Sequence, residues 1–99
     1  MLVVSGTMSF AAGSADAVQD AMRKVTAATV QETGCISYRF YPDMDNPDHY
    51  RVFEEWESMD ALKAHGASDH IADYRATLQS IGVLTREITV YHVEKSTNL

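Results

Sequence analysis

The residues best suited to chemistry lie close together in the second half of the chain. His65 and His70 are five residues apart across Gly66, and the only tryptophan, Trp56, precedes them. Histidine has an ordinary pKa of about 6.5, so an imidazole that points into a pocket can take a proton from an acidic hydroxyl. Helix-end hydrogen bonding is the plainer explanation of both histidines. We hypothesise that His65 and His70 are catalytic, and that Trp56 is either a pocket wall or a core plug.

Further rings and one carboxylate accompany this group. Tyr38 and Tyr74 either pack in the core or line an aromatic cavity, which is the usual setting for a flat apolar ligand. Glu54 shares one face of a predicted strand with Trp56, so it must be paired or hydrogen-bonded. A structural ion pair and a substrate contact are both open for Glu54. The available cations are Arg39, Arg75 and Arg86.

The sequence lacks the motifs of metal and nucleotide sites. There is no HxH or HExxH pattern, no third histidine or cysteine at ligand spacing, and no GxGxxG or GxxxxGK loop. No serine, histidine and aspartate can be placed as a triad. We therefore predict no metal site and no nucleotide-phosphate site.

Composition limits the other classes of function. The 99 residues predict a single domain at 1–95 with a short tail at 96–99. The net charge is −6 and the basic residues are scattered, so neither nucleic acid nor a membrane is expected as a partner. No apolar run approaches the roughly 20 residues that span a bilayer, and the N-terminus does not resemble a signal peptide. The single cysteine, Cys35, fits a reducing cytoplasm.

Hydrophobic periodicity predicts six elements, the last helix of which is broken in two. Apolar residues at 18, 22, 25 and 29 recur at helical spacing, with Gly34 as the predicted end of that helix. Ser14, Ser58 and Ser68 are predicted N-caps. The predicted elements are a strand at 2–10, a helix from 15, strands at 35–41 and 50–56, helices at 59–65 and 69–81, and a strand at 86–93.

This order is the split βαβ, or ferredoxin-like, plan of the α+β class. It predicts a four-stranded antiparallel sheet with helices on one face. Phe53, Tyr91 and Val93 point to the other face, which no segment remains to cover. A second copy packing sheet to sheet is the simplest solution, so we expect a homodimer.

Three motifs give the chain a resemblance to the antibiotic biosynthesis monooxygenase family, which includes small quinol monooxygenases. The resemblance covers nearly the whole chain and is most specific through the helix break. The motifs are Glu32-x-Gly34-Cys35-x-x-Tyr38, Tyr50-x-x-Phe53-Glu54-x-Trp56-x-Ser58 and Ala61-Leu62-x-Ala64-His65-x-x-Ser68-x-His70.

The resemblance implies a dimeric α+β barrel, with a pocket in each protomer between helices and sheet. It further implies oxidation of a small quinol, phenol or polyketide-like aromatic by dioxygen, without a cofactor. A positioned base removes a phenolic proton, and the anion then reduces dioxygen. Carried over by position, the pocket residues are Trp56, His65 and His70, with Tyr38 and Tyr74 as candidates.

Two other branches resemble the chain less closely. Haem-degrading members carry an asparagine and a histidine where this chain has Gly6 and Arg75, which disfavours haem degradation. A branch that isomerises a phosphorylated molecule keeps Glu54 and both histidines, but its substrate would need a cationic pocket and this chain is acidic. The alternative to an oxygenase is therefore a small-molecule isomerase, or a ligand-binding module without turnover.

Overall fold

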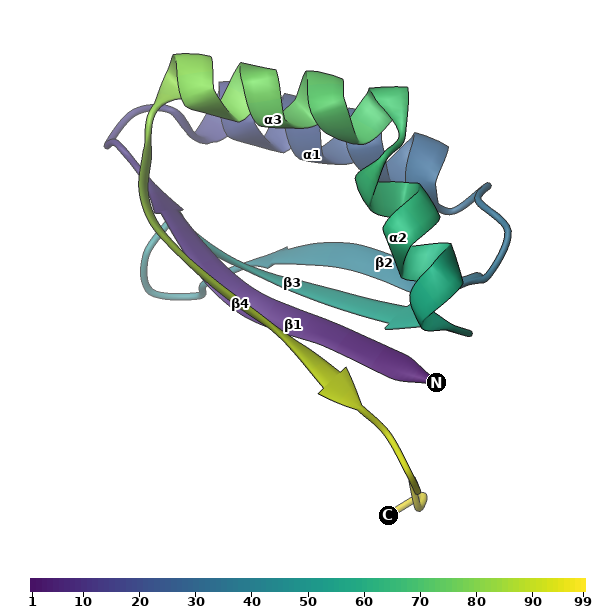
Figure 1. Ribbon diagram of the computed structural model, residues 1–99. Helices are drawn as coiled ribbons and strands as arrows, with labels where there is room; N and C mark the ends of the chain where they lie inside the picture. Colours follow the sequence, from purple (N-terminus) through teal and green to yellow (C-terminus); the bar gives the residue numbers. More distant parts are fainter.

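The computed structural model describes all residues from Met1 to Leu99 and has the predicted α+β ferredoxin-like fold. The four strands form one antiparallel sheet in the order β2-β3-β1-β4. Figure 1 shows the three helices on a single face of it. The elements are β1 Leu2–Phe10, α1 Ala15–Thr29, β2 Cys35–Pro42, β3 His49–Trp56, α2 Met59–Gly66, α3 Asp69–Ile81 and β4 Val83–His92.

The central strands β1 and β3 alternate as a half-covered sheet requires. Even-numbered residues on both strands point towards the helices and are buried, among them Val4, Met8 and Val52. Odd-numbered residues such as Thr7 and Arg51 lie on the uncovered outer face, where the Arg51 guanidinium donates a hydrogen bond to Ser5. The inner face therefore forms the floor of the hydrophobic core.

Helix α1 buries the predicted stripe of Val18, Met22, Val25 and Thr29 against the sheet. It ends at Thr29, five residues before the predicted stop at Gly34, and residues 30–34 form a turn. Gly34 has a positive φ of 85°, and a Cβ atom there would press on the Cβ of Ala61. The glycine is thus required by the entry into β2 and not by the helix end.

Serine caps begin α2 and α3, as predicted, whereas the predicted cap at Ser14 is wrong, because its hydroxyl donates to the Ala11 carbonyl oxygen and caps no amide of α1. The Ser58 hydroxyl accepts a hydrogen bond from the Ala61 amide at 3.2 Å, and the Ser68 hydroxyl accepts one from the Ile71 amide at 3.3 Å. The second cap restarts the chain as α3 only three residues after His65. The end of α2 and the start of α3 therefore lie next to each other.

Strand β4 forms one edge of the sheet and begins at Val83, three residues earlier than predicted. Beside it on β1 lies Gly6, where a Cβ atom would collide with the Glu87 carbonyl oxygen and the Ile88 Cα. Gly6 therefore allows the close approach of β4. No helix or strand follows His92, and no helix is both long and apolar enough to span a membrane.

Candidate active site

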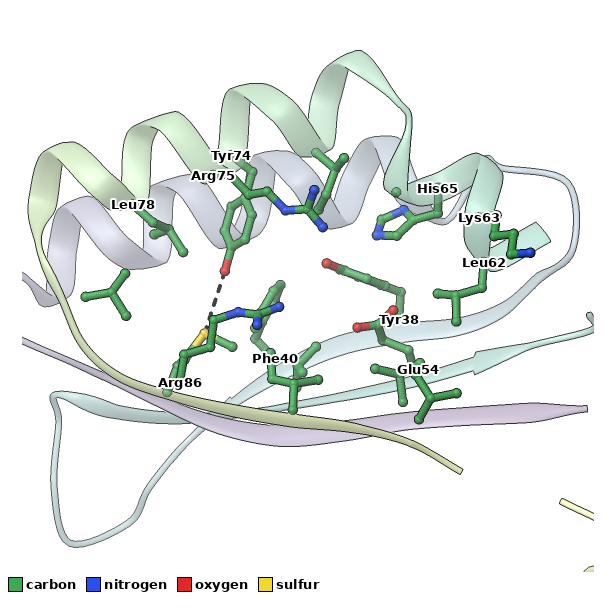
Figure 2. A pocket seen from close by; sticks show the side chains of 18 of the residues that line it. Tyr38, Phe40, Glu54, Leu62, Lys63, His65, Tyr74, Arg75, Leu78 and Arg86 are labelled. Atoms are coloured by element: carbon green, nitrogen blue, oxygen red, sulfur yellow. Dashed lines mark hydrogen bonds between the residues drawn. The ribbon is translucent and has the colours of Figure 1, made fainter. Parts of the chain in front are cut away.

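A cavity of about 800 Å³ lies between α2, α3 and the inner face of the sheet (Figure 2). Fourteen of its 21 lining residues are hydrophobic, and the volume falls in the range of small-molecule sites. Exposed lining residues come from β4, such as Val83 and Val90, and from α3, such as Arg75 and Gln79, so the cavity opens to solvent between these two elements. The polar lining residues are Glu54, Lys63, His65, Arg75, Gln79 and Arg86.

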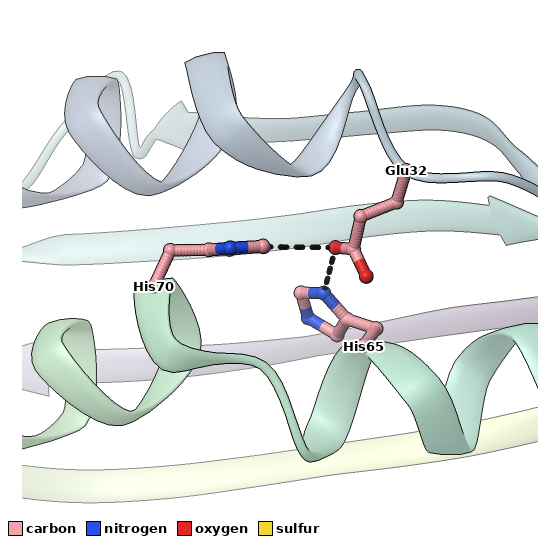
Figure 3. A group of neighbouring side chains, drawn as sticks. All are labelled: Glu32, His65 and His70. Carbon is pink, nitrogen blue, oxygen red and sulfur yellow. Dashed lines mark hydrogen bonds and ion pairs between the residues drawn. The ribbon is translucent and has the colours of Figure 1, made fainter.

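His65 is the histidine that faces this cavity. It lies in the last turn of α2, is only 5% exposed, and lines the cavity. Its Nδ1 lies 2.6 Å from Oε2 of Glu32, in the loop after α1. The Nε2 of His70, in the first turn of α3, lies 3.0 Å from the same oxygen (Figure 3). His70 does not line the cavity, so its contact with Glu32 is what joins it to the site.

The shared carboxylate fixes which nitrogens carry protons. An ionised carboxylate can only accept hydrogen bonds, so both ring nitrogens that face Glu32 are N–H donors. In neutral His65 the proton is then on Nδ1, and Nε2 keeps its lone pair. Figure 2 shows the His65 ring pointing towards the cavity. Glu32 therefore orients His65 as a proton acceptor, a role that sequence reasoning did not give to Glu32.

Glu54 lies on the cavity floor, and its pKa is raised to about 7. Burial is the main cause, opposed by a hydrogen bond from the indole Nε1 of Trp56 at 2.9 Å and by the charges of Arg86 and Arg75. The expected ion pair of Glu54 is wrong, because no cation lies within 4 Å of it. Of the three candidate cations, Arg39 lies on the outer face, paired with Phe53.

Trp56 does not line the cavity, contrary to its assignment as a pocket wall. It has no exposed surface, and its ring lies 4.9 Å from that of His65 between centroids. Its indole N–H donates a hydrogen bond to Glu54. Trp56 thus contacts both His65 and Glu54 on the side away from the cavity, and it can affect a ligand only through these two side chains.

Tyr38 and Tyr74 both line the cavity, as predicted. Burial raises the pKa of each phenol well above its ordinary value, and the Glu54 charge adds to this. Both side chains therefore stay protonated and can donate a hydrogen bond to a ligand oxygen. The Tyr38 ring lies 5.3 Å from the His65 ring, whereas the Tyr74 hydroxyl contacts the Met8 sulfur at 3.8 Å.

Three cations line the cavity and were not assigned to it from the sequence. They are Lys63 on α2, Arg75 on α3 and Arg86 on β4. Strand alternation could have found Arg86, because it shares the inner face with Ile88 and Val90. Arg75 follows Tyr74 on α3, and both side chains line the cavity.

Glu32, His65 and His70 are also the one group of side chains able to hold a metal ion. Their donor atoms lie within 4.8 Å of one another, and two imidazoles with a carboxylate suit several divalent transition metals. Glu32 supplies the third donor that the sequence motifs lacked. The absence of a metal from the working site stays a prediction.

Comparison with known proteins settles the family. The sequence profile described as antibiotic biosynthesis monooxygenase matches residues 1–77. The chain belongs to this family. No curated protein matches the sequence.

Solved structures of the antibiotic biosynthesis monooxygenase family share the fold closely. A proposed family member from Deinococcus radiodurans is 27% identical, with a TM-score of 0.93 over 100% of this chain and 98% of that one. A second from Nitrosomonas europaea is 19% identical, with a TM-score of 0.88 over 96% and 100%. SnoaB, a cofactor-independent oxygenase of Streptomyces nogalater, is 13% identical, with a TM-score of 0.82 over 96% and 94%.

Proposed function

We propose that this family member is a cofactor-independent monooxygenase that oxidises a small quinol, phenol or polyketide-like aromatic with dioxygen. The observation that carries the proposal is His65, which lines an apolar cavity while Glu32 holds its far nitrogen at 2.6 Å. A base oriented in this way is what deprotonation of a phenolic hydroxyl requires. The description of SnoaB as a cofactor-independent oxygenase supports the same assignment.

The reaction begins with proton transfer. The Nε2 of His65 accepts a proton from the substrate hydroxyl, and Glu32 stabilises the imidazolium that forms. The positive charges of Arg75 and Arg86 on the cavity wall favour the substrate anion. Tyr38, which stays protonated, can donate a hydrogen bond to the same oxygen.

The anion then supplies the electrons. It transfers one electron to dioxygen, and the two radicals combine to form a C–O bond at a ring carbon. The His65 imidazolium returns its proton to the peroxide, the O–O bond breaks, and water leaves as that carbon loses its hydrogen and becomes a carbonyl. For a quinol the balance is quinol plus dioxygen to hydroxyquinone plus water, so the substrate provides all four electrons.

Oxygen consumption tests the proposal. Purified protein treated with a chelator is added to a panel of hydroquinones, naphthols and anthrones in an oxygen electrode, with autoxidation blanks. We expect at least one substrate to consume dioxygen above its blank, with one oxygen atom from ¹⁸O₂ in the product by mass spectrometry. Consumption equal to the blank for every substrate would contradict the proposal for these compound classes.

A second candidate is isomerisation, or binding without turnover, of an anionic small molecule. The acidic composition had argued against a phosphorylated ligand, but Lys63, Arg75 and Arg86 make the cavity itself cationic. Glu54, with its pKa raised to about 7, could move a proton between neighbouring carbons. An isomerase would convert its substrate equally well under nitrogen, whereas the monooxygenase requires dioxygen.

We also propose that the protein works as a homodimer through the outer face of the sheet, in a reducing cytoplasm. Phe53 is half-buried on that face and Tyr91 is exposed, with no segment of the chain above them. Cys35 is a free thiol, as a reducing compartment allows.

Sedimentation velocity tests the dimer, and Phe53→Arg is expected to shift the sedimentation coefficient from that of a dimer to that of a monomer. A monomeric wild type at micromolar concentration would contradict it.

A further inference from the structure

The charges of this protein are distributed unevenly between its surface and its cavity. The whole chain has 14 acidic and eight basic residues, for a net charge of −6. The cavity lining holds three of the basic residues, Lys63, Arg75 and Arg86, and only one acidic residue, Glu54. The sign of charge in the cavity is therefore opposite to that of the molecule, which attracts anions to this one place.

None of the three cations forms an ion pair with a side chain of the protein. The only ion pairs are those of Glu32 with the two histidines. Arg75 comes from α3 and Arg86 from β4, on opposite walls, and Figure 2 shows both guanidinium groups reaching into the cavity. Both lower the pKa of Glu54, so their charges act on the same part of the floor.

The surroundings of these cations are aromatic and aliphatic. The ring centroids of Phe40 and Tyr74 lie 5.8 Å apart, and both rings line the cavity together with Ile88. A guanidinium binds a planar oxyanion through two parallel hydrogen bonds. An apolar surface next to two unpaired guanidinium groups therefore fits a ligand with a flat ring and an attached oxyanion.

We propose that the cavity binds an aromatic ligand that carries an oxyanion, a carboxylate or a phosphate, held between Arg75 and Arg86. The ring extends from there towards Tyr38 and His65. The assignment of this ligand as the oxidised substrate rests on the function proposed above. The binding itself does not depend on turnover.

Matched probes that cannot be oxidised as quinols test the binding alone. Isothermal titration calorimetry compares 2-naphthoate, its neutral analogue 2-naphthamide, and 2-naphthyl phosphate. We expect at least tenfold tighter binding of an oxyanion probe than of the amide, with an affinity that falls as salt is raised. The tighter of the two anions identifies the oxyanion. Equal affinities for all three probes, or no binding at millimolar concentration, would overturn the proposal.

Variants locate the anion. Arg75→Gln and Arg86→Gln are each expected to weaken oxyanion binding at least fivefold and to leave the amide unchanged. Arg23→Gln on α1 is the matched control, because Arg23 is exposed and lies outside this cavity, and the variant should bind as the wild type does. Arg75 and Arg86 are exposed, so the variants should keep the wild-type circular dichroism. Unchanged affinity in both cavity variants, or an equal loss in Arg23→Gln, would overturn the assignment.

The two proposals fail in different ways. If hydroquinones are oxidised but naphthoate and naphthamide bind equally, the monooxygenase proposal holds and the proposed binding of an oxyanion by Arg75 and Arg86 is wrong. If no substrate consumes oxygen but naphthoate binds through Arg75 and Arg86, the oxyanion site is confirmed and the monooxygenase proposal is wrong.

Discussion

Helices α1 and α3 lie side by side over the same face of one sheet, yet they cover it differently (Figure 1). Helix α1 buries four residues, and Val18 and Thr29 have no exposed surface. Helix α3 buries only Ile71 and Leu78, and the cavity lies beneath it. Side chains fill the core around Val18, Val25 and Thr29 of α1, and the cavity that borders Met22 is about 460 Å³, against about 800 Å³ under α3. Closely packed halves hold a fold together, and incompletely packed ones provide room for a ligand.

The largest expected effect is the loss of kcat when the proposed base, His65, is removed from the cavity. His65→Ala is expected to lower kcat for any oxidised quinol by about 10²–10⁴-fold, because general base catalysis contributes on this scale. Glu32→Gln should lower kcat by a comparable factor, because a neutral amide in place of the carboxylate cannot stabilise the His65 imidazolium. Steady-state oxygen uptake measures both.

His49→Ala is the control, since His49 is exposed at the start of β3 and lies outside the cavity. It should retain wild-type kcat. Full activity in His65→Ala with unchanged thermal unfolding would mean that another group removes the proton, and Glu54 would be the next candidate.

Core truncations compare the two halves directly. Val25→Ala under α1 is expected to lower the free energy of unfolding by about 2–3 kcal/mol, because Val25 lines neither cavity and its truncation leaves a new void in closely packed surroundings. Val52→Ala, the same change on the cavity floor, should cost about 1–1.5 kcal/mol, because Val52 already borders open space. Urea unfolding measures both. Equal losses would show that the cavity is filled or collapsed in solution.

The buried carboxyl of Glu54 makes stability depend on pH. Its pKa rises from 4.5 in the unfolded chain to about 7 in the fold, mainly through burial, so between these values the folded state binds more protons. Stability attributable to Glu54 is therefore present below about pH 4.5 and is lost as pH rises to 7, by about 3 kcal/mol. Arg75 and Arg86 oppose the shift and Glu32 adds to it.

Glu54→Gln should remove this dependence and gain stability relative to wild type at about pH 8, as followed by urea unfolding at several pH values. Glu57→Gln is the control, because Glu57 is exposed just after β3 and its side chain forms no hydrogen bond or ion pair. A pH dependence unchanged by Glu54→Gln would place the titrating group elsewhere.

The smallest expected effect is that of His70, which reaches the site only through Glu32. His70→Ala should lower kcat by about three- to tenfold while KM stays near that of the wild type. His70→Asn, which can still donate to Glu32, should recover part of the loss. A loss as large as that of His65→Ala would mean that His70 contacts substrate.

The sequence predicted the elements well because their signals are local. The apolar stripe from Val18 to Thr29, the caps at Ser58 and Ser68, and the alternation along β1 each depend on nearby residues. The termini of the elements were less exact. Strand β4 starts at Val83, where pairing with Phe10 extends it, and that pairing is not visible in either segment alone.

The site was predicted less completely, because its contacts are long-range. His65, Tyr38 and Tyr74 line the cavity as expected. Glu32, however, lies 33 residues from His65 in a loop without periodicity, and only its place in the shared motif marked it. Glu54 was expected beside a cation and instead bonds the indole two residues away, since both point to the same face of β3.

Gly6 has an evolutionary consequence. It lies on the inner face of the sheet between Val52 and Ile88, and any side chain there would collide with the backbone of β4. Any substitution of Gly6 therefore requires the edge strand β4, which carries Arg86 on the cavity wall, to move away from β1. The absence of one side chain thus restricts which mutations this position can accept while the cavity keeps its shape.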